Sequence, residues 1–156
     1  VAHGLAPAAA ANHLLCEVGL SGHFATAVCG RATGAGVVEL ANAGHCRPLV
    51  VGHGQAAGAI DDGGMPLGMF YNAKYRLTRT SLDRGQSLLL YTDGLSEASN
   101  GDSLEYGAAR IARVASECAA RAADGLVSAC LEDLAAFLAG TRRHDDLTVM
   151  ALQRVN

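Results

Sequence analysis

The chain has 156 residues and a formal net charge of −3, from 12 lysines and arginines against 15 aspartates and glutamates. This length suits one domain, and we expect residues 1–156 to form a single domain. Half of the residues are hydrophobic but only 4% are aromatic, so we expect a core made mainly of Ala, Val and Leu. The charge balance supplies no basic face for a phosphate backbone, which excludes nucleic acid as a partner.

The cysteines and the apolar runs exclude two further classes of protein. The five cysteines are an odd number without C-x-x-C spacing, which predicts reduced thiols rather than a disulfide framework or a zinc site. No apolar run approaches the roughly 20 residues that span a bilayer, and the start lacks the plan of a signal peptide. We therefore expect a cytoplasmic protein with no membrane contact, and the first residue, Val1, indicates a piece of a longer chain.

The first part of the chain predicts a series of short strands. Alternating or apolar runs bounded by turn residues occupy residues 23–31, 37–43, 48–52, 74–82 and 87–91. A glycine-rich turn at 32–36 makes the first two of these runs a hairpin, and a polar loop is expected at 52–64. The run at 87–91 is apolar throughout, which is typical of a central strand covered on both faces.

The second part predicts two helices and a final strand. Apolar residues recur at helical spacing over residues 104–120 and 125–139, so both helices should lie on a single face of one sheet. Gly140 ends the second helix, and residues 147–155 form a strand. Strands followed by two helices and a strand predict an α+β fold, in which helices pack on antiparallel sheets.

The first candidate site residue is Asp93, which follows the apolar run at 87–91 and precedes Gly94. An acid at the end of a buried strand is held on a rigid backbone, which suits a ligand of a divalent metal ion. A plain Asp-Gly turn explains this dipeptide equally well.

The second candidate lies in the segment Arg142-Arg143-His144-Asp145-Asp146, directly before the last predicted strand. Successive strand residues face opposite sides, so only one of the two acids is expected to point at a given site. Taken alone, the segment is better explained as a charged loop ahead of a strand.

The third candidate is His45, in the segment Asn42-Ala43-Gly44-His45, as a catalytic base or a metal ligand. A histidine in such a segment more often fixes a turn through hydrogen bonds. The other histidines show no ligand-like pairing, and an oxygen-rich site with few histidines favours Mg²⁺ or Mn²⁺ over zinc.

Five motifs follow one another along the chain: Phe-Ala-Thr at 24–26, Asn-Ala-Gly-His at 42–45, Pro-Leu-Gly at 66–68, Tyr-Thr-Asp-Gly at 91–94 and Asp-Asp-Leu-Thr at 145–148. In this order they resemble the metal-dependent serine/threonine protein phosphatases of the type 2C (PPM) family, in the branch of stage II sporulation protein E. The resemblance runs from about residue 12 to the end of the chain.

The resemblance implies a four-layer α-β-β-α sandwich of two antiparallel sheets flanked by helices, with part of one helical layer missing here. It also implies a site for two Mn²⁺ or Mg²⁺ ions. Asp93 and Asp145 would be catalytic metal ligands, Asp146 the less critical neighbour, and the backbone carbonyl of Val1 would face a metal ion. The family's first aspartate, which bridges both ions, would stand immediately before Val1.

The same resemblance implies hydrolysis of phosphoserine or phosphothreonine on a regulatory protein, an anti-sigma-factor antagonist in partner switching. The expected partners are this phosphorylated protein, a sensory or receiver domain in the parent chain, and a second copy in a homodimer. The alternative is a catalytically impaired module that binds a phosphoprotein or regulates a partner. The missing first acid favours this alternative, and the two remaining acids oppose it.

The start of the chain departs most from the family. Relatives place two helices between the segment that resembles residues 1–5 and the asparagine-leucine stretch that begins here at Asn12. We therefore expect residues to be missing before Val1 and between Ala6 and Asn12. A true deletion is the alternative, and an unbroken chain through residues 6–12 would favour the binding module.

Overall fold

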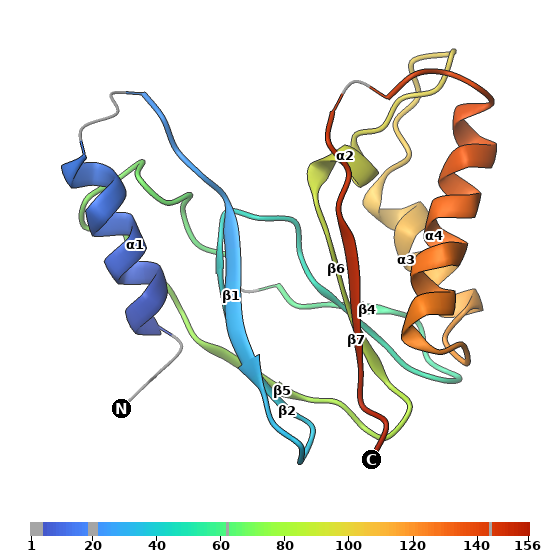
Figure 1. Ribbon diagram of the computed structural model, residues 1–156, viewed down its shortest axis with the longest axis horizontal. Coiled ribbons are helices and arrows are strands. Elements are labelled where there is room, and N and C mark those ends of the chain that lie inside the picture. The colour runs from blue at the N-terminus through green and yellow to red at the C-terminus, as the bar shows by residue number, and fades with distance from the viewer. Residues whose placement is uncertain (1–4, 19–21, 62, 144) are drawn as a thin grey trace. The chain divides into compact units, whose positions relative to one another are not determined.

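The computed structural model describes residues 5–18, 22–61, 63–143 and 145–156, and the chain divides into two compact units. The first unit comprises Val1–Arg47 and Ile60–Ser81, and the second comprises Pro48–Ala59 and Leu82–Asn156. In the described residues, each unit contains an antiparallel sheet, with one helix beside it in the first unit and three helices in the second (Figure 1). The prediction of an α+β fold with two antiparallel sheets and flanking helices is confirmed.

The sheet of the first unit has the strand order β1-β2-β5. Strands β1 (Ala27–Ala32) and β2 (Val37–Ala43) form the predicted hairpin, and β5 (Thr78–Ser81) pairs with the other side of β2. Strand β2 has its predicted bounds. The predicted strand at 23–31 begins later than expected, because Ala25 forms a single bridge with Leu67 instead of extending the hairpin.

Helix α1 (Leu5–Glu17) packs against β2 of this sheet and was not predicted. Four consecutive alanines at 8–11 favour a helix by intrinsic propensity, although the segment lacks a clear apolar stripe. Helix α1 runs through residues 6–12, where missing residues were expected, and that expectation stays a prediction. Val1, at which a further gap was expected, lies outside the described residues.

The sheet of the second unit has the strand order β4-β3-β6-β7. Strand β6 (Ser87–Tyr91) has its predicted bounds and lies between β3 (Leu49–Val51) and β7 (Val149–Gln153), with Leu89 fully buried. The short edge strand β4 (Gly58–Ala59) falls in the segment predicted to be a loop.

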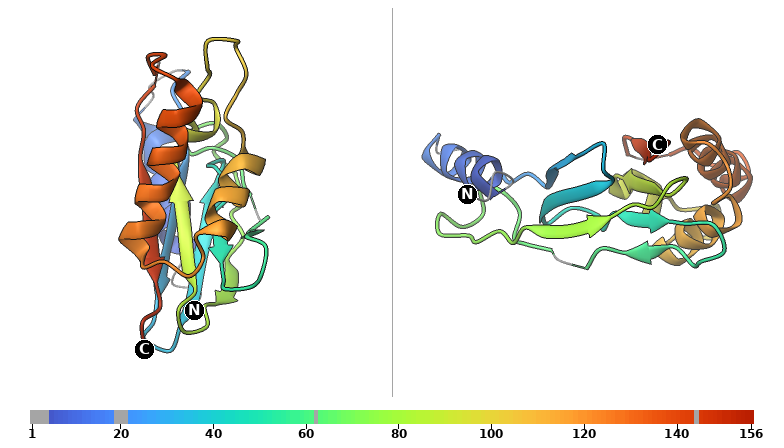
Figure 2. Two further views of the ribbon diagram at one scale, coloured as in Figure 1. Left: turned by 90° about the vertical axis from the view of Figure 1, so that its right-hand side faces the viewer. Right: turned by 90° about the horizontal axis from the view of Figure 1, so that it is seen from below.

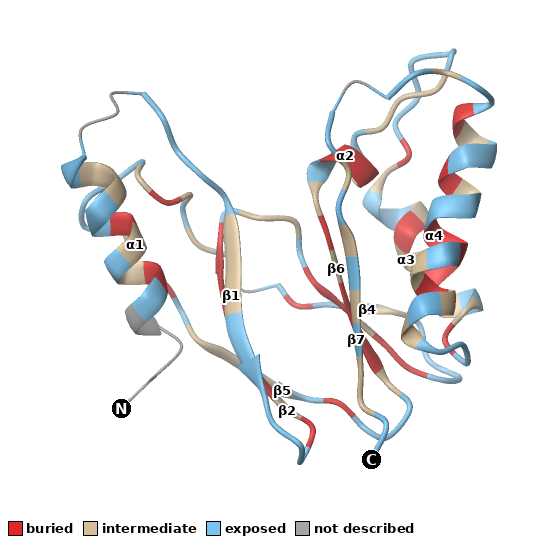
Figure 3. Cartoon of the chain, in the orientation of Figure 1, coloured by how far each residue is buried: buried red, intermediate tan, exposed pale blue. Residues whose placement is uncertain are grey.

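Two long helices, α3 (Ala108–Glu117) and α4 (Ala123–Leu138), lie side by side over one face of this sheet (Figure 2, left). Helix α3 contacts β3 and α4 contacts both α3 and β7, so the predicted packing of both helices on one face is confirmed. Buried positions recur along both helices, with exposed positions between them (Figure 3). In the part of the chain that the structure describes, no helix combines the length and apolar character that crossing a bilayer requires.

Candidate metal centre

Asp93 lies at the end of the central strand of the second unit. The buried apolar run of β6 ends at Tyr91, Thr92 follows, and Asp93 begins the single-turn helix α2 (Asp93–Ser96). The Asp93 side chain is exposed, and its Oδ1 accepts a hydrogen bond from the backbone N–H of Gly94 at 3.0 Å. The carboxylate is therefore held by its own turn while it remains open to solvent.

Asp145 and Asp146 lie in the loop between α4 and β7. Both side chains are exposed, and Oδ1 of Asp145 accepts a hydrogen bond from the backbone N–H of Asp146 at 2.8 Å. The strand predicted at 147–155 is shorter in the structure, because β7 begins only at Val149, so the two acids lie in a loop ahead of the strand. The intervening Thr148 bonds to Thr92 instead of extending the regular ladder of β6 and β7.

Thr92 joins the two acid-bearing segments. Its backbone N–H donates to the carbonyl of Thr148 at 3.0 Å, and its hydroxyl oxygen accepts from the N–H of Thr148 at 3.0 Å. The same hydroxyl lies 3.4 Å from the carbonyl oxygen of Asp146. The segments that carry Asp93 and Asp145 therefore lie next to each other, although 52 positions separate them in the sequence (145 − 93).

Gly94 allows this close approach. A Cβ atom at position 94 would overlap the backbone carbonyl of Asp146, so a residue with a side chain would push the two segments apart. The Asp-Gly dipeptide is thus more than a turn signal, because its glycine is required by the opposite segment.

The donor chemistry of these segments fits a hard divalent ion. Carboxylate oxygens are the ligands that Mg²⁺ and Mn²⁺ prefer, and Asp93 and Asp145 are exposed, each accepting a hydrogen bond from the next residue in its own turn. Asp145 and Asp146 line a shallow pocket together with Arg142 and Arg143. In the described ranges, no group of three or more His, Cys, Asp or Glu side chains is placed to hold a metal ion. Two acids supply part of a ligand set, and Val1, a further expected ligand, lies outside the described residues.

His45 belongs to a turn of the first unit. The Asn42 side chain closes this turn: its Oδ1 accepts from the N–H of His45 at 2.8 Å, and its Nδ2 donates to the His45 carbonyl at 3.0 Å. The His45 ring nitrogen Nδ1 lies 3.1 Å from the hydroxyl of Thr26. Of the two interpretations of the Asn-Ala-Gly-His segment, the structure shows the hydrogen-bonded turn.

The three early motifs form one corner of the first unit. Beyond the Thr26–His45 contact, Ala25 pairs with Leu67, and Gly44 has a φ of +72° with Pro66 packed against it. Gly44 therefore meets two demands, since a Cβ there would lie 2.7 Å from Cγ of Pro66 in a backbone conformation that side chains disfavour.

Sequence reasoning assigned no role to Asn12, which anchors α1 to this corner. Its side chain is fully buried and bonds to the Gly68 N–H, the Tyr75 hydroxyl and the carbonyls of Phe70 and Tyr71. A polar residue between alanines and leucines is the one signal that could have indicated such a buried contact.

The comparisons with known proteins agree with this picture. The profile of the family described as Stage II sporulation protein E (SpoIIE) matches residues 2–155. No curated protein matches the chain. Among solved structures, the RsbU and RsbW domains of Rv1364c from Mycobacterium tuberculosis are 26% identical with a TM-score of 0.68, and the match covers 92% of this chain and 45% of that one.

Two further structures share the fold at lower identity. The SiaA-PP2C domain of Pseudomonas aeruginosa is 18% identical with a TM-score of 0.76, and the match covers 96% of this chain and 59% of that one. The phosphatase domain of SpoIIE from Bacillus subtilis, presoaked with Mn, is 12% identical with a TM-score of 0.61, covering 82% and 56%. This chain thus spans 45–59% of the length of these three structures. Since the family profile matches nearly every residue, the chain belongs to the SpoIIE family of PP2C-like phosphatase domains.

Proposed function

We propose that this protein is a metal-dependent phosphatase that removes phosphate from phosphoserine or phosphothreonine on a regulatory protein. The observation that carries the proposal is the placement of Asp93 and Asp145 on adjoining segments of the second unit, in a chain of the SpoIIE family. Neither carboxylate makes an ion pair with a described residue, so no cationic side chain among those residues occupies them.

Asp93 and Asp145 are the residues that would hold Mn²⁺ or Mg²⁺. When bound, such an ion supplies positive charge for the phosphoryl oxygens and acidifies water at neutral pH. The chain itself contributes rigidity. Thr92 bonds to the segment that carries Asp145, and the paired strands β6 and β7 lead directly into the two segments that carry the acids. Arg142 and Arg143, beside Asp145, offer guanidinium groups that would attract a phosphate dianion.

The relatives support one class of substrate. One similar structure contains the RsbU and RsbW domains of Rv1364c from Mycobacterium tuberculosis, which supports a role of this chain in partner switching. By analogy, the substrate of this protein is a phosphorylated anti-sigma-factor antagonist, and a sensory or receiver domain would control the activity.

A second candidate function is that of a catalytically impaired module that binds a phosphoprotein. One observation favours it: in the described ranges, no group of three or more His, Cys, Asp or Glu side chains is placed to hold a metal ion. This candidate predicts binding of the phosphoprotein without release of phosphate.

The test is release of phosphate from phosphorylated anti-sigma-factor antagonists by the full-length protein, with and without Mn²⁺. The variants Asp93→Asn and Asp145→Asn should reduce Mn²⁺-dependent release to background and leave the melting temperature unchanged. Asp83→Asn is the matched control, because Asp83 is an exposed acid that precedes the other end of β6. Release that continues without metal ions, or that survives Asp93→Asn, would contradict the proposal. Binding without release by the wild-type protein would support the second candidate.

A further inference from the structure

Tyr106 lies where the loop after α2 returns to the body of the second unit. The loop is closed by its own bonds: Ser99 bridges to Glu105, and the Asn100 side chain accepts from the backbone N–H groups of Asp102 and Leu104. At its end, Tyr106 N–H donates to the Ala98 carbonyl at 2.8 Å. Tyr106, two residues before the first residue of α3, is thereby bonded to the segment that follows α2.

A second set of bonds continues from this point to Asp93. Gly107 N–H donates to the Ser96 carbonyl at 2.8 Å, and Glu97 N–H donates to the Asp93 carbonyl at 2.7 Å. The Ser96 hydroxyl lies 3.4 Å from the same Asp93 carbonyl. The backbone of Asp93 is thus connected to that of Tyr106 and Gly107 by consecutive hydrogen bonds.

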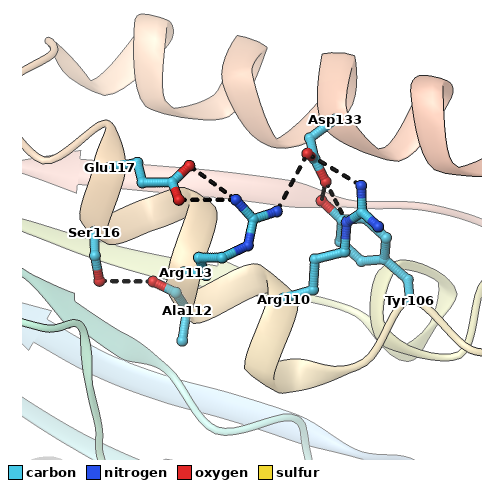
Figure 4. A network of polar contacts seen from close by, with 7 residues as sticks. All are labelled: Tyr106, Arg110, Ala112, Arg113, Ser116, Glu117 and Asp133. Carbon is cyan, nitrogen blue, oxygen red and sulfur yellow. Dashed lines mark hydrogen bonds and ion pairs between the residues drawn. The ribbon is translucent and has the colours of Figure 1, made fainter.

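The side chain of Tyr106 extends the connection to α4. It is 3% exposed, its hydroxyl donates to Oδ2 of Asp133 at 2.7 Å, and its ring meets that of Phe137 edge-on with centroids 5.3 Å apart. Figure 4 shows the hydroxyl and the guanidinium of Arg110 converging on the Asp133 carboxylate.

Arg113 pairs with Oδ1 of Asp133 at 3.5 Å, and Arg110 contacts both Asp133 and Tyr106. The Arg110 Nε donates to Oδ2 of Asp133 at 2.6 Å, its terminal nitrogen lies 3.3 Å from Oδ1, and its guanidinium carbon lies 5.2 Å from the centre of the Tyr106 ring. Hydrogen bonding from Arg110 lowers the pKa of Asp133, and burial together with the Asp133 bond raises the pKa of Tyr106. Tyr106 therefore remains a hydroxyl donor and Asp133 an ionised acceptor at neutral pH.

We propose that Tyr106 and Asp133 are positioning residues for the metal centre. Asp133 holds Tyr106 against α4, and Tyr106 in turn holds α2 and the Asp93 turn at the end of β6. The link to metal binding rests on the proposed function, whereas the mechanical coupling of Asp133 to α2 stands on the contacts alone. The rival explanation is that the cluster only ties α3 to α4.

The variant Tyr106→Phe removes the hydroxyl and keeps the ring. Its matched control is Ser116→Ala, which removes a hydroxyl of α3 that accepts from the N–H of Ala57 and donates to the carbonyl of Ala112. Asp133→Asn is the conservative variant, because an amide oxygen still accepts from Tyr106. All are to be made in the full-length protein, prepared free of metal ions.

The first measurement is amide hydrogen exchange in the metal-free protein. Tyr106→Phe should speed exchange at Glu97, Tyr106 and Gly107 by about tenfold relative to Leu89, whose buried position in β6 reports global opening. Asp133→Asn should have a smaller effect and Ser116→Ala none at these amides. Equal acceleration at Leu89, equal effects of Ser116→Ala, or no change at all would overturn the proposal.

The second measurement is Mn²⁺ binding by titration calorimetry. Tyr106→Phe should weaken binding by about threefold to tenfold, below the range for residues that bond directly to metal ligands, and Ser116→Ala should leave it unchanged. Unchanged Mn²⁺ affinity in Tyr106→Phe would remove the link to the metal centre. If the wild-type protein shows the coupling but releases no phosphate, the proposed function fails and the positioning role stands.

Discussion

The motif residues of the two units serve different purposes. In the first unit, Thr26, Asn42 and His45 bond to one another, and the Pro-Leu-Gly segment packs on the same corner. In the second unit, Asp93 and Asp145 present exposed carboxylates whose hydrogen bonds go to the next residue along the chain. The motif residues of the first unit form hydrogen bonds within their own corner, whereas the carboxylates of the second unit can accept further bonds from a ligand.

This difference teaches how a family pattern should be interpreted. All five motifs contribute to the resemblance, and the two motifs of the second unit contain the exposed carboxylates of Asp93 and Asp145. The polar residues of the first unit are hydrogen-bonded within their corner, and the bonds of the buried Asn42 side chain are expensive to leave unmade. Substitutions should therefore change stability in the first unit, whereas the acids of the second unit should tolerate removal without loss of stability.

The largest effect on stability is expected for Asn12→Ala in the first unit. The substitution removes four hydrogen bonds of a fully buried side chain, so the Gly68 N–H and the Tyr71 carbonyl lose the bond to Asn12, whereas the Phe70 carbonyl keeps its bond from the Ala73 N–H. We expect the free energy of unfolding to fall by about 4 kcal/mol, measured by urea denaturation. The control is His13→Ala at the exposed neighbour, which stacks on Tyr71 and should cost less than about 1 kcal/mol. Equal losses in the two variants would show that Asn12 is not an anchor.

The next effect concerns the core of the second unit. Leu134 is 3% exposed on the sheet-facing side of α4, so Leu134→Ala should leave a cavity and lower the free energy of unfolding by about 3 kcal/mol, inside the usual range of roughly 2–5 kcal/mol. Leu131 on the same helix is 40% exposed, and Leu131→Ala should cost less than about 1 kcal/mol. A loss below about half a kcal/mol for Leu134→Ala would mean that this stripe does not face the sheet.

The smallest expected loss of stability concerns the Asn-Ala-Gly-His segment, in which the side chains of Asn42 and His45 can be compared. Asn42→Ala removes both bonds that close the turn, and it should cost about 2 kcal/mol because Asn42 is buried. His45→Ala removes one contact with Thr26 and should cost less than about 1 kcal/mol. Thermal unfolding of both variants measures the difference. A larger loss for His45→Ala would indicate a role for the imidazole that the turn does not explain.

The sequence predicted the elements whose patterns are local. Strands β2 and β6 were placed at their observed bounds, because turn residues flank an apolar run in each case. Helices α3 and α4 carry clear apolar stripes and were also predicted. Helix α1 was missed, because alanines without a stripe do not show a periodic pattern, and its anchoring by Asn12 depends on residues 56–63 positions away.

The candidate site was only partly accessible to sequence reasoning. Asp93 and Asp145 were singled out by their motifs, and their convergence on one metal ion stays a prediction. The bonds that bring their segments together join Thr92 to Thr148, 56 positions apart, and those of the positioning cluster join Tyr106 to Asp133, 27 positions apart. No local pattern encodes such pairs, since each partner is an ordinary residue until the fold places them together.

Gly94 has a consequence for how copies of this domain could diverge. Any side chain at that position would collide with the carbonyl of Asp146, in the segment that follows Asp145. A single substitution of Gly94 would therefore disrupt the candidate metal centre while every acid remained in the sequence. The sequence of such an inactive relative would still contain all the acidic ligands, so a search for the ligands alone would not identify it as inactive. To judge whether a member of this family is still an active enzyme, one should therefore look for a glycine at the position of Gly94 as well as for the acidic ligands.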